Sequence, residues 1–335
     1  MPRSRPPSPV HEGVALTNLD QPLFDGAGVV KRDLVDYLDA VADRMLPHLR
    51  DRPLSVVRAR PGQPPFMQKN LPAHAPEWIE RVEVPAEASR RVVTYPLCQD
   101  RRTLLWLANQ RAVEYHPTLV RGRDGEVTHL VVDLDPPEGG GFAPVVAAAQ
   151  LVRATVAEAG LTAAVKTSGA KGLHVLVPLA AGVRVVDAAA ATRALAARAG
   201  RVDPALVTTE FLRAERDGRI YLDPTRSGGA SLAAAYSPRA RPGVPVSFPV
   251  AWDDLDRIDP AACTVRTAAA LLAAHDPWAQ DPPEARALPA DLVEEGHAIP
   301  LPRVVAMHAG KRRAAAARRA ASDDRPAGEA GTPPS

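Results

Sequence analysis

The chain has 335 residues and a formal net charge of +2, with 41 Lys and Arg against 39 Asp and Glu. This near balance gives no overall basic signature for nucleic acid, so a nucleic-acid site must come from local clusters. The two cysteines, Cys98 and Cys263, fit no metal-ligand spacing, which predicts reduced thiols. The sequence shows no signal peptide and no apolar run long enough to span a bilayer, so we expect a soluble, cytoplasmic protein with no membrane partner.

The first organised segment is predicted to be an amphipathic helix over residues 31–49. Five apolar residues recur there at helical spacing: Leu34, Leu38, Val41, Met45 and Leu49. Three strands and a second helix should follow, at residues 54–58, 91–96, 112–116 and, for the helix, 101–110. We therefore expect an N-terminal α/β module over residues 14–114, after a disordered stretch at residues 1–13.

A second α/β module is expected over residues 115–300. It begins with the strand "HLVVDLD", continues with an alanine-rich helix over residues 142–159, and then has two strands, "AAVKTS" and "LHVLV", joined by "GAKG". "RIYLD" and "SLAAAYS" also have strand character, and "PVSFPVAWDDL" reads as an extended segment that closes the module. The tail, residues 308–335, has a biased, basic composition and should be disordered.

Two acids, Asp133 and Asp135, end the apolar strand in "THLVVDLDPP". Because side chains alternate along a strand, both project from the same face. Carboxylates so close together repel each other unless they bind a cation, and Mg²⁺ or Mn²⁺ prefers carboxylate oxygens. A pair of solvated acids at a strand end is the alternative, and the motif alone leaves both interpretations open.

Two further segments support a site for metal and phosphate. "KTSGAKGLHVLV" places Ser168 and Lys171 in a turn of small residues and His174 in the next strand, which suits an anionic phosphate. An ordinary hairpin turn with a surface lysine and a core histidine is the alternative. Asp223 ends "GRIYLD" as a third strand-terminal acid, or serves as a turn residue.

A basic cluster surrounds Asp223. Residues 213–241 contain six arginines and three acids, which predicts either a phosphate-binding surface or a solvated surface of mixed charge. The six are Arg213, Arg216, Arg219, Arg226, Arg239 and Arg241.

Seven segments occur in this order along the chain: "TNLDQPLF", "FMQKNLPAHAPEW", "VEYHP", "VVDLDPP", "TSGAKGLHVLVPL", "GRIYLDPTR" and "YSPRARPGVPV". Together they resemble the polymerase domain of bacterial DNA ligase D, in the archaeo-eukaryotic primase superfamily. The resemblance covers residues 16–256. It implies a two-layer α+β primase-polymerase fold, with an RRM-like antiparallel catalytic sheet and a packed N-terminal α/β module.

The resemblance also implies an activity. The chain would be a template-directed DNA nucleotidyltransferase that adds NTPs or dNTPs to DNA ends and 5′-phosphorylated gaps in bacterial non-homologous end joining, with two Mn²⁺ or Mg²⁺ ions. A Lys-x-Asp-Gly adenylation motif is missing from the sequence, so we expect a stand-alone, nucleoid-associated polymerase that works with Ku and a separate ATP-dependent DNA ligase.

Each site residue has a role implied by the resemblance. The metal ligands, which are also the catalytic residues, would be Asp133, Asp135 and Asp223. The nucleotide-binding residues would be His116, Ser168, Lys171, His174, Arg239 and Arg241. The expected DNA-binding residues are Lys31, Arg58, Phe66 and Lys69. Gln21 stands where the family has a second lysine for the 5′-phosphate, and Met67 where it has a second stacking phenylalanine, so both contacts should be weaker.

Two other functions remain as alternatives. A DNA-end-binding scaffold that works with Ku could keep the fold and lose turnover, although all three carboxylates are present. A phosphatase of the haloacid dehalogenase type also begins with a strand-terminal Asp-x-Asp. There the motif lies early in the chain and continues with Thr or Val, whereas here it lies mid-chain and continues with Pro136.

Overall fold

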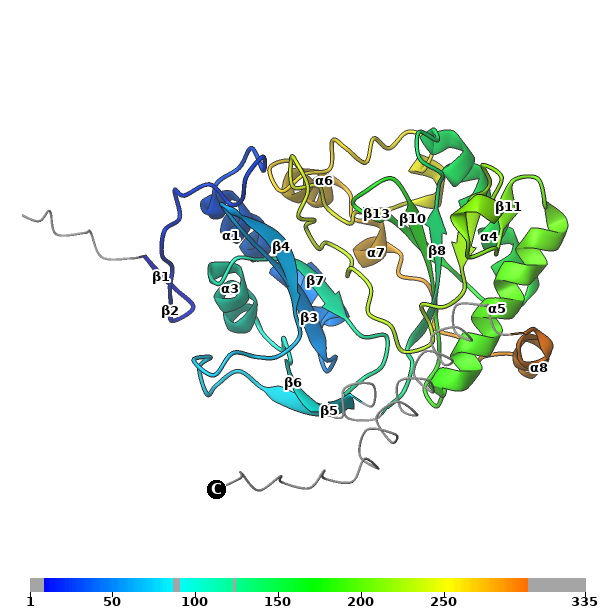
Figure 1. The fold of residues 1–335 in the computed structure, drawn as a ribbon, viewed down its shortest axis with the longest axis horizontal. Coiled ribbons are helices and arrows are strands. Elements are labelled where there is room, and N and C mark those ends of the chain that lie inside the picture. The colour runs from blue at the N-terminus through cyan, green and yellow to red at the C-terminus, as the bar shows by residue number, and fades with distance from the viewer. Residues whose placement is uncertain (1–8, 87–90, 123–124, 301–335) are drawn as a thin grey trace, which may run out of the picture.

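The computed structural model describes residues 9–86, 91–122 and 125–300, which form two halves lying side by side (Figure 1). The buried apolar side chains of both halves belong to one continuous core. Within the described residues, no helix is both long and apolar enough to cross a membrane. The predicted mixed α+β architecture is confirmed, and the predicted tail lies outside the described residues.

The N-terminal half is built on a three-stranded antiparallel sheet of order β4-β3-β7 and on an antiparallel hairpin of β5 and β6. A short hairpin pairs β1 with β2, and its first strand lies within residues 1–13, which were expected to be disordered. The strands are β1 (Val10–His11), β2 (Val14–Ala15), β3 (Leu54–Arg60), β4 (Gln63–Gln68), β5 (Arg81–Ala86), β6 (Arg91–Pro96) and β7 (Ala112–Pro117). The helices are α1 (Lys31–Ala40), α2 (Ala42–Met45) and α3 (Arg101–Asn109).

The predicted helix over residues 31–49 is interrupted. The backbone of Val41 leaves the helical region, with φ −102° and ψ 4°, and separates α1 from α2. A 3₁₀ turn over Leu46–His48 follows, where Pro47 lacks the N–H that an α-helix would use. The apolar face predicted from the sequence is buried nevertheless, because both pieces pack that face on the same core.

The second half is built on a six-stranded sheet of order β11-β12-β8-β10-β9-β13. Every neighbouring pair is antiparallel except β11 and β12. The strands are β8 (His129–Asp135), β9 (Ala164–Thr167), β10 (Leu173–Pro178), β11 (Val207–Thr208), β12 (Ile220–Asp223) and β13 (Pro249–Val250). The helices are α4 (Phe142–Glu158), α5 (Val185–Val202), α6 (Ala268–Ala274), α7 (Pro277–Gln280) and α8 (Ala290–Ala298).

Helices α4 and α5 cover the face of the central sheet that points away from the N-terminal half (Figure 1). Alanine-rich faces let these helices approach closely, and α8 packs in turn on α5. Gly296 of α8 permits this contact, because a Cβ atom there would lie 1.9 Å from the carbonyl oxygen of Ala190. The opposite face of the sheet is left open toward the other half and carries the polar residues described below.

"SLAAAYS" does not form the predicted strand. It runs as a connecting segment beside β7, held by bonds from Leu232 N to Pro117 O (3.3 Å) and from Ala234 N to Tyr115 O (2.9 Å), and it leaves β geometry at Tyr236, where φ is 67°. Because β7 continues to Pro117 in the N-terminal sheet, the predicted module boundary after residue 114 falls inside this strand.

Candidate active site

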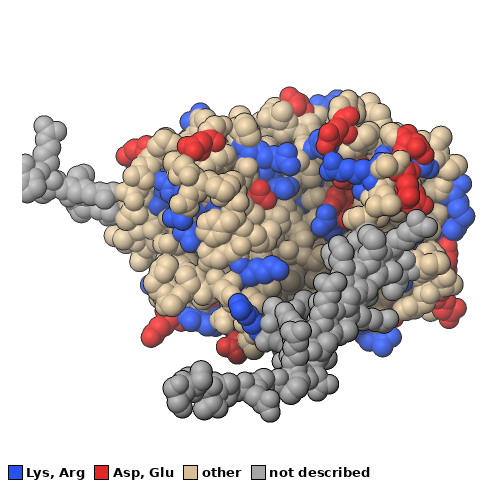
Figure 2. Space-filling model, in the orientation of Figure 1, with Lys and Arg blue, Asp and Glu red and all other residues tan. Residues whose placement is uncertain are grey.

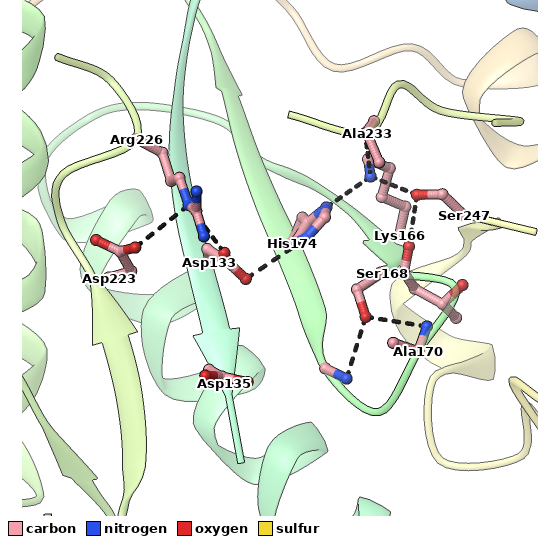
Figure 3. Close-up of polar contacts among 12 residues, drawn as sticks. Asp133, Asp135, Lys166, Ser168, Ala170, His174, Asp223, Arg226, Ala233 and Ser247 are labelled. Carbon is pink, nitrogen blue, oxygen red and sulfur yellow. Dashed lines mark hydrogen bonds and ion pairs between the residues drawn. The ribbon is translucent and has the colours of Figure 1, made fainter. Parts of the chain in front are cut away.

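Four polar side chains form one row across the open face of the central sheet. Asp223 of β12 lies opposite Asp133 of β8, Asp133 lies opposite His174 of β10, and His174 lies opposite Lys166 of β9. Residues directly opposite each other in an antiparallel pair project from the same face. The register therefore brings together residues that are up to 90 positions apart in the chain, and Figure 3 shows them facing one another.

An arginine lies between the first two carboxylates of this row. Arg226 Nε is 3.1 Å from Asp133 Oδ2 and 3.2 Å from Asp223 Oδ2 (Figure 3). Asp223 Oδ1 also accepts hydrogen bonds from the N–H and hydroxyl of Thr225, at 2.9 and 2.6 Å. Asp135, at the end of β8, is half exposed and lies 3.5 Å from Arg216 Nη1. Each acid of the predicted metal site is thus paired with an arginine.

Asp133 is the acid whose protonation is most affected by its surroundings. Burial raises its pKa to about 6, with a further contribution from the negative charges of Asp223 and Asp135, while Arg226 acts in the opposite direction. An acid in this environment is stabilised in its charged form by added positive charge. Within the described residues, however, His, Cys, Asp and Glu side chains form no group of three that is arranged to hold a metal.

His174 connects Asp133 to a buried lysine. Its Nε2 lies 3.4 Å from Asp133 Oδ1, and its Nδ1 lies 2.6 Å from Lys166 Nζ. The ammonium side chain of Lys166 is fully buried. Burial and the charge of Arg239 lower its pKa well below the usual value, while burial and the charge of Lys166 lower the pKa of His174.

The turn between β9 and β10 lies against the end of β8. Ser168 Oγ accepts hydrogen bonds from the N–H groups of Ala170 and Gly172, both at 3.2 Å, and so shapes the turn. A Cβ atom on Gly172 would lie 2.3 Å from Leu134 O, which explains the glycine. Lys171 is exposed and lines a pocket of about 210 Å³ with Asp135 and the arginines at 213 and 216.

Two of the predicted nucleotide-binding residues, His116 and Arg239, lie outside the central sheet and form a second cluster around Glu114. His116 Nε2 is 2.7 Å from Glu114 Oε2, and Arg239 Nε is 3.0 Å from the same oxygen. Ala240 N donates to Glu114 Oε1 at 2.8 Å, and Arg239 also donates to the carbonyl of Ser168. Burial alone would raise the pKa of Glu114, but these partners lower it to about 2.

Glu114 therefore links His116 and Arg239 across the two halves. Arg241 is exposed two residues further on. Figure 2 shows a hollow in the middle of this face, with several Lys and Arg side chains around it.

The predicted DNA-binding residues lie in different environments. Lys31 is only 2% exposed, and its ammonium donates to Thr17 O at 2.7 Å and to Asn109 Oδ1 at 2.6 Å. It is neither a solvated residue nor free to meet a phosphate in this conformation. Gln21 is exposed, and its side-chain carbonyl accepts from Arg111 at 2.9 Å.

A second group of predicted DNA-binding residues lies at the edge strand β4. Phe66, Met67 and Lys69 are exposed there. The guanidinium of Arg58 lies 5.8 Å from the ring centre of Phe66 and donates to Gln110 O at 2.7 Å. This edge offers an aromatic ring, a thioether and two cations to a partner.

Four residues of this site, Glu114 among them, were not assigned a role from the sequence. Arg226 and Arg216 were counted only as members of a basic cluster, and Lys166 only as the start of a motif. The signal for Arg226 was its position three residues after Asp223. The signal for Lys166 was a lysine inside an otherwise apolar strand.

The chain is similar to known proteins over most of its length. A family model described as "LigD, primase-polymerase domain" matches residues 30–278. The multifunctional non-homologous end joining DNA repair protein LigD of Mycobacterium tuberculosis is 36% identical over 260 residues, which are 74% of this chain and 34% of that protein. The bifunctional non-homologous end joining protein LigD of Bacillus subtilis is 31% identical over 264 residues, 77% of this chain and 42% of that protein.

A solved structure extends the comparison to the fold. The polymerase domain from Mycobacterium tuberculosis Ligase D in complex with DNA is 32% identical, with a TM-score of 0.71 over 84% of this chain and 98% of that chain. The chain spans about a third of the length of the mycobacterial relatives. Because the family model covers well over half of its residues, the chain belongs to the LigD primase-polymerase domain family.

Proposed function

We propose that this chain is a template-directed nucleotidyltransferase that adds NTPs or dNTPs to DNA ends and gaps in bacterial non-homologous end joining. The observation that carries the proposal is the row of Asp223, Asp133 and His174 across three neighbouring strands, beside the turn at residues 168–172. The family and the DNA-bound relative support the class of substrate. Ku and a separate ATP-dependent DNA ligase are the partners that the proposal implies.

The chemistry of the donor set suits divalent metal ions, although the described residues form no group of three acids arranged to hold one in this structure. Asp133, Asp135 and Asp223 offer carboxylate oxygens at adjoining strand ends, and Arg226 already supplies positive charge between two of them. Mn²⁺ or Mg²⁺ held there would lower the pKa of an attacking 3′-hydroxyl and neutralise the triphosphate. The three carboxylates supply the negative charge of the site. Because burial raises the pKa of Asp133, a cation bound there would favour the charged form of this acid.

The protein groups beside the acids are suited to a triphosphate. Lys171 is exposed at the turn and Arg241 is exposed beyond it, so both are available for charge-assisted contacts. The hydroxyl of Ser168 already accepts two backbone bonds and can still donate its own hydrogen. Arg239 and His116 are held in place by Glu114, which fixes their direction before a nucleotide arrives.

For the DNA strand we propose the β4 edge, where Phe66 stacks on a base and Lys69 and Arg58 contact phosphates. A contact between Lys31 and a 5′-phosphate remains part of the proposal, but it requires this buried ammonium to leave Thr17 and Asn109.

Primer extension tests the proposal. Purified protein, a gapped duplex with a 5′-phosphate, Mn²⁺ and each NTP or dNTP should give elongated primer. Asp133→Ala and Asp223→Ala should abolish the product, whereas Asp291→Ala should not, because Asp291 is an exposed acid of α8 beyond the opposite face of the sheet. Extension by either active-site variant at the wild-type rate would refute the assignment.

One observation favours a second candidate function. Arg226 neutralises two of the three acids, as it would in a DNA-end-binding scaffold that works with Ku and has little turnover. Wild-type protein that binds gapped DNA but gives no elongated primer with any nucleotide would support the scaffold.

A further inference from the structure

Lys166 is a charged residue in a place where an apolar one would cost less. Its side chain lies on the same face of the sheet as His174 and is fully buried between His174 and Ser247. Burying an ammonium requires that hydrogen bonds replace its water, and a residue such as Met could fill the same space without that cost. The lysine therefore calls for an explanation beyond packing.

The hydrogen bonds around Lys166 leave little freedom (Figure 3). Ser247 Oγ lies 2.5 Å from Nζ and uses its own hydrogen to donate to Thr167 O at 2.8 Å, so it accepts from the lysine. Ala233 O, at 2.9 Å, can only accept. The third neighbour, 2.6 Å away, is Nδ1 of His174. When Nζ is protonated, its three N–H bonds meet these three neighbours, and the ring nitrogen is then the third acceptor.

We propose that Lys166 is a positioning residue, which holds Nδ1 of His174 as a hydrogen-bond acceptor and thereby keeps a hydrogen on Nε2, the nitrogen that faces Asp133. A neutral imidazole carries one hydrogen, so a donor at Nδ1 places it on Nε2. That N–H lies 3.4 Å from Asp133 Oδ1, at the centre of the row of acids. The consequence for turnover rests on the proposed nucleotidyl transfer, whereas the tautomer does not.

The arrangement tolerates a shift of the proton within the pair. Lys166 also borders a small cavity of about 30 Å³, with Arg52, His48 and His129 on its lining. Burial, and after it the charge of Arg239, lower the pKa of Lys166, whereas the charge of Asp133 acts in the opposite direction. If the shared proton passes from Nζ to Nδ1, the ring becomes an imidazolium, and Nε2 still keeps its hydrogen. In both of these forms, in which the pair keeps the shared proton, Nε2 is a donor toward the nearby Asp133 Oδ1.

Histidine NMR tests the proposal directly. Metal-free protein labelled with ¹⁵N-histidine should show His174 with its hydrogen on Nε2, the signals being assigned by their loss in His174→Gln. In Lys166→Met the ring should populate the Nδ1–H form. An Nδ1–H form in the wild type would overturn the proposal without any variant at Lys166, and an unchanged tautomer in Lys166→Met would overturn it as well. These measurements need no turnover, so they stand apart from the test of the proposed function.

A double-mutant cycle separates positioning from a structural role. Lys166→Met should lower kcat/KM for the nucleotide about 10- to 100-fold, by analogy with the loss of groups that orient metal-ligating histidines. In a His174→Gln background the same change should have an effect below about twofold, because the group that Lys166 positions is gone. Equal losses in both backgrounds would show that Lys166 only supports the fold, and would refute the inference.

Discussion

Replacing Arg226 by glutamine should tighten Mn²⁺ binding about 30-fold. The guanidinium of Arg226 pairs with Asp133 and Asp223 at 3.1 and 3.2 Å, and its side chain is 39% exposed. Partly exposed ion pairs contribute about 1 kcal/mol each, so a metal ion that displaces the arginine gives up about 2 kcal/mol. Since about 1.4 kcal/mol is a factor of ten in an equilibrium constant, glutamine at this position should raise the Mn²⁺ affinity roughly 30-fold.

Free Mn²⁺ can be titrated by electron paramagnetic resonance, which reports binding without catalysis. The matched control is Arg201→Gln, which removes one positive charge from the end of α5, where Arg201 pairs with Glu295. That variant should bind Mn²⁺ as the wild type does. Weaker or unchanged binding by Arg226→Gln would show that the arginine assists the metal or stays beside it, and the reasoning about competition would be wrong.

Three further changes test the surroundings of the site. Glu114→Gln should lower the free energy of unfolding by up to about 3 kcal/mol at pH 7. The pKa of Glu114 is lowered from 4.5 to about 2, so its contribution is complete above pH 4.5 and lost as the pH falls toward 2; urea titrations at pH 7 and pH 3 that gave the same difference would contradict this. Gly172→Ala should cost about 1–3 kcal/mol and most primer extension, because its Cβ would meet a backbone oxygen at 2.3 Å, whereas Gly200→Ala in α5 should be neutral or stabilising in the same thermal assay. For Lys31, burial and the charge of Arg111 lower the pKa to about 8 from 10.5, so wild-type stability relative to Lys31→Met should rise between pH 8 and 10.5, by about 3 kcal/mol in all; a pH-independent difference would count against a buried ammonium.

The strands that carry the acids of the site, and the acids themselves, could be predicted because they depend on local patterns. Alternation along β8 and the ends of the apolar runs marked Asp133 and Asp223 as strand-terminal acids, and the small-residue turn marked His174. Arg226 could be placed only with the register of β12 against β8, which brings it to an acid 93 residues away in the chain. A sequence pattern does not contain such a register.

Lys31 shows the same limit in another way. Its position at the start of α1 predicts exposure, because the first turn of a helix is usually at the surface. The loop before α1 and the end of α3 close over it, with Thr17 and Asn109 as acceptors of its hydrogen bonds. Asn109 is 78 residues away, so the enclosure depends on tertiary packing alone.

The segment beside β7 has a consequence for how the protein melts. Its bonds to β7 include one from Tyr115 N to Ser237 Oγ at 2.9 Å, and it is also tied to α1, where Tyr37 donates to Tyr236 O at 2.8 Å. Together with the shared core, these bonds join the halves through buried hydrogen bonds rather than through a flexible linker. Heat should therefore disrupt both halves in one cooperative transition, with equal calorimetric and van't Hoff enthalpies, so that neither half persists as an independently folded fragment.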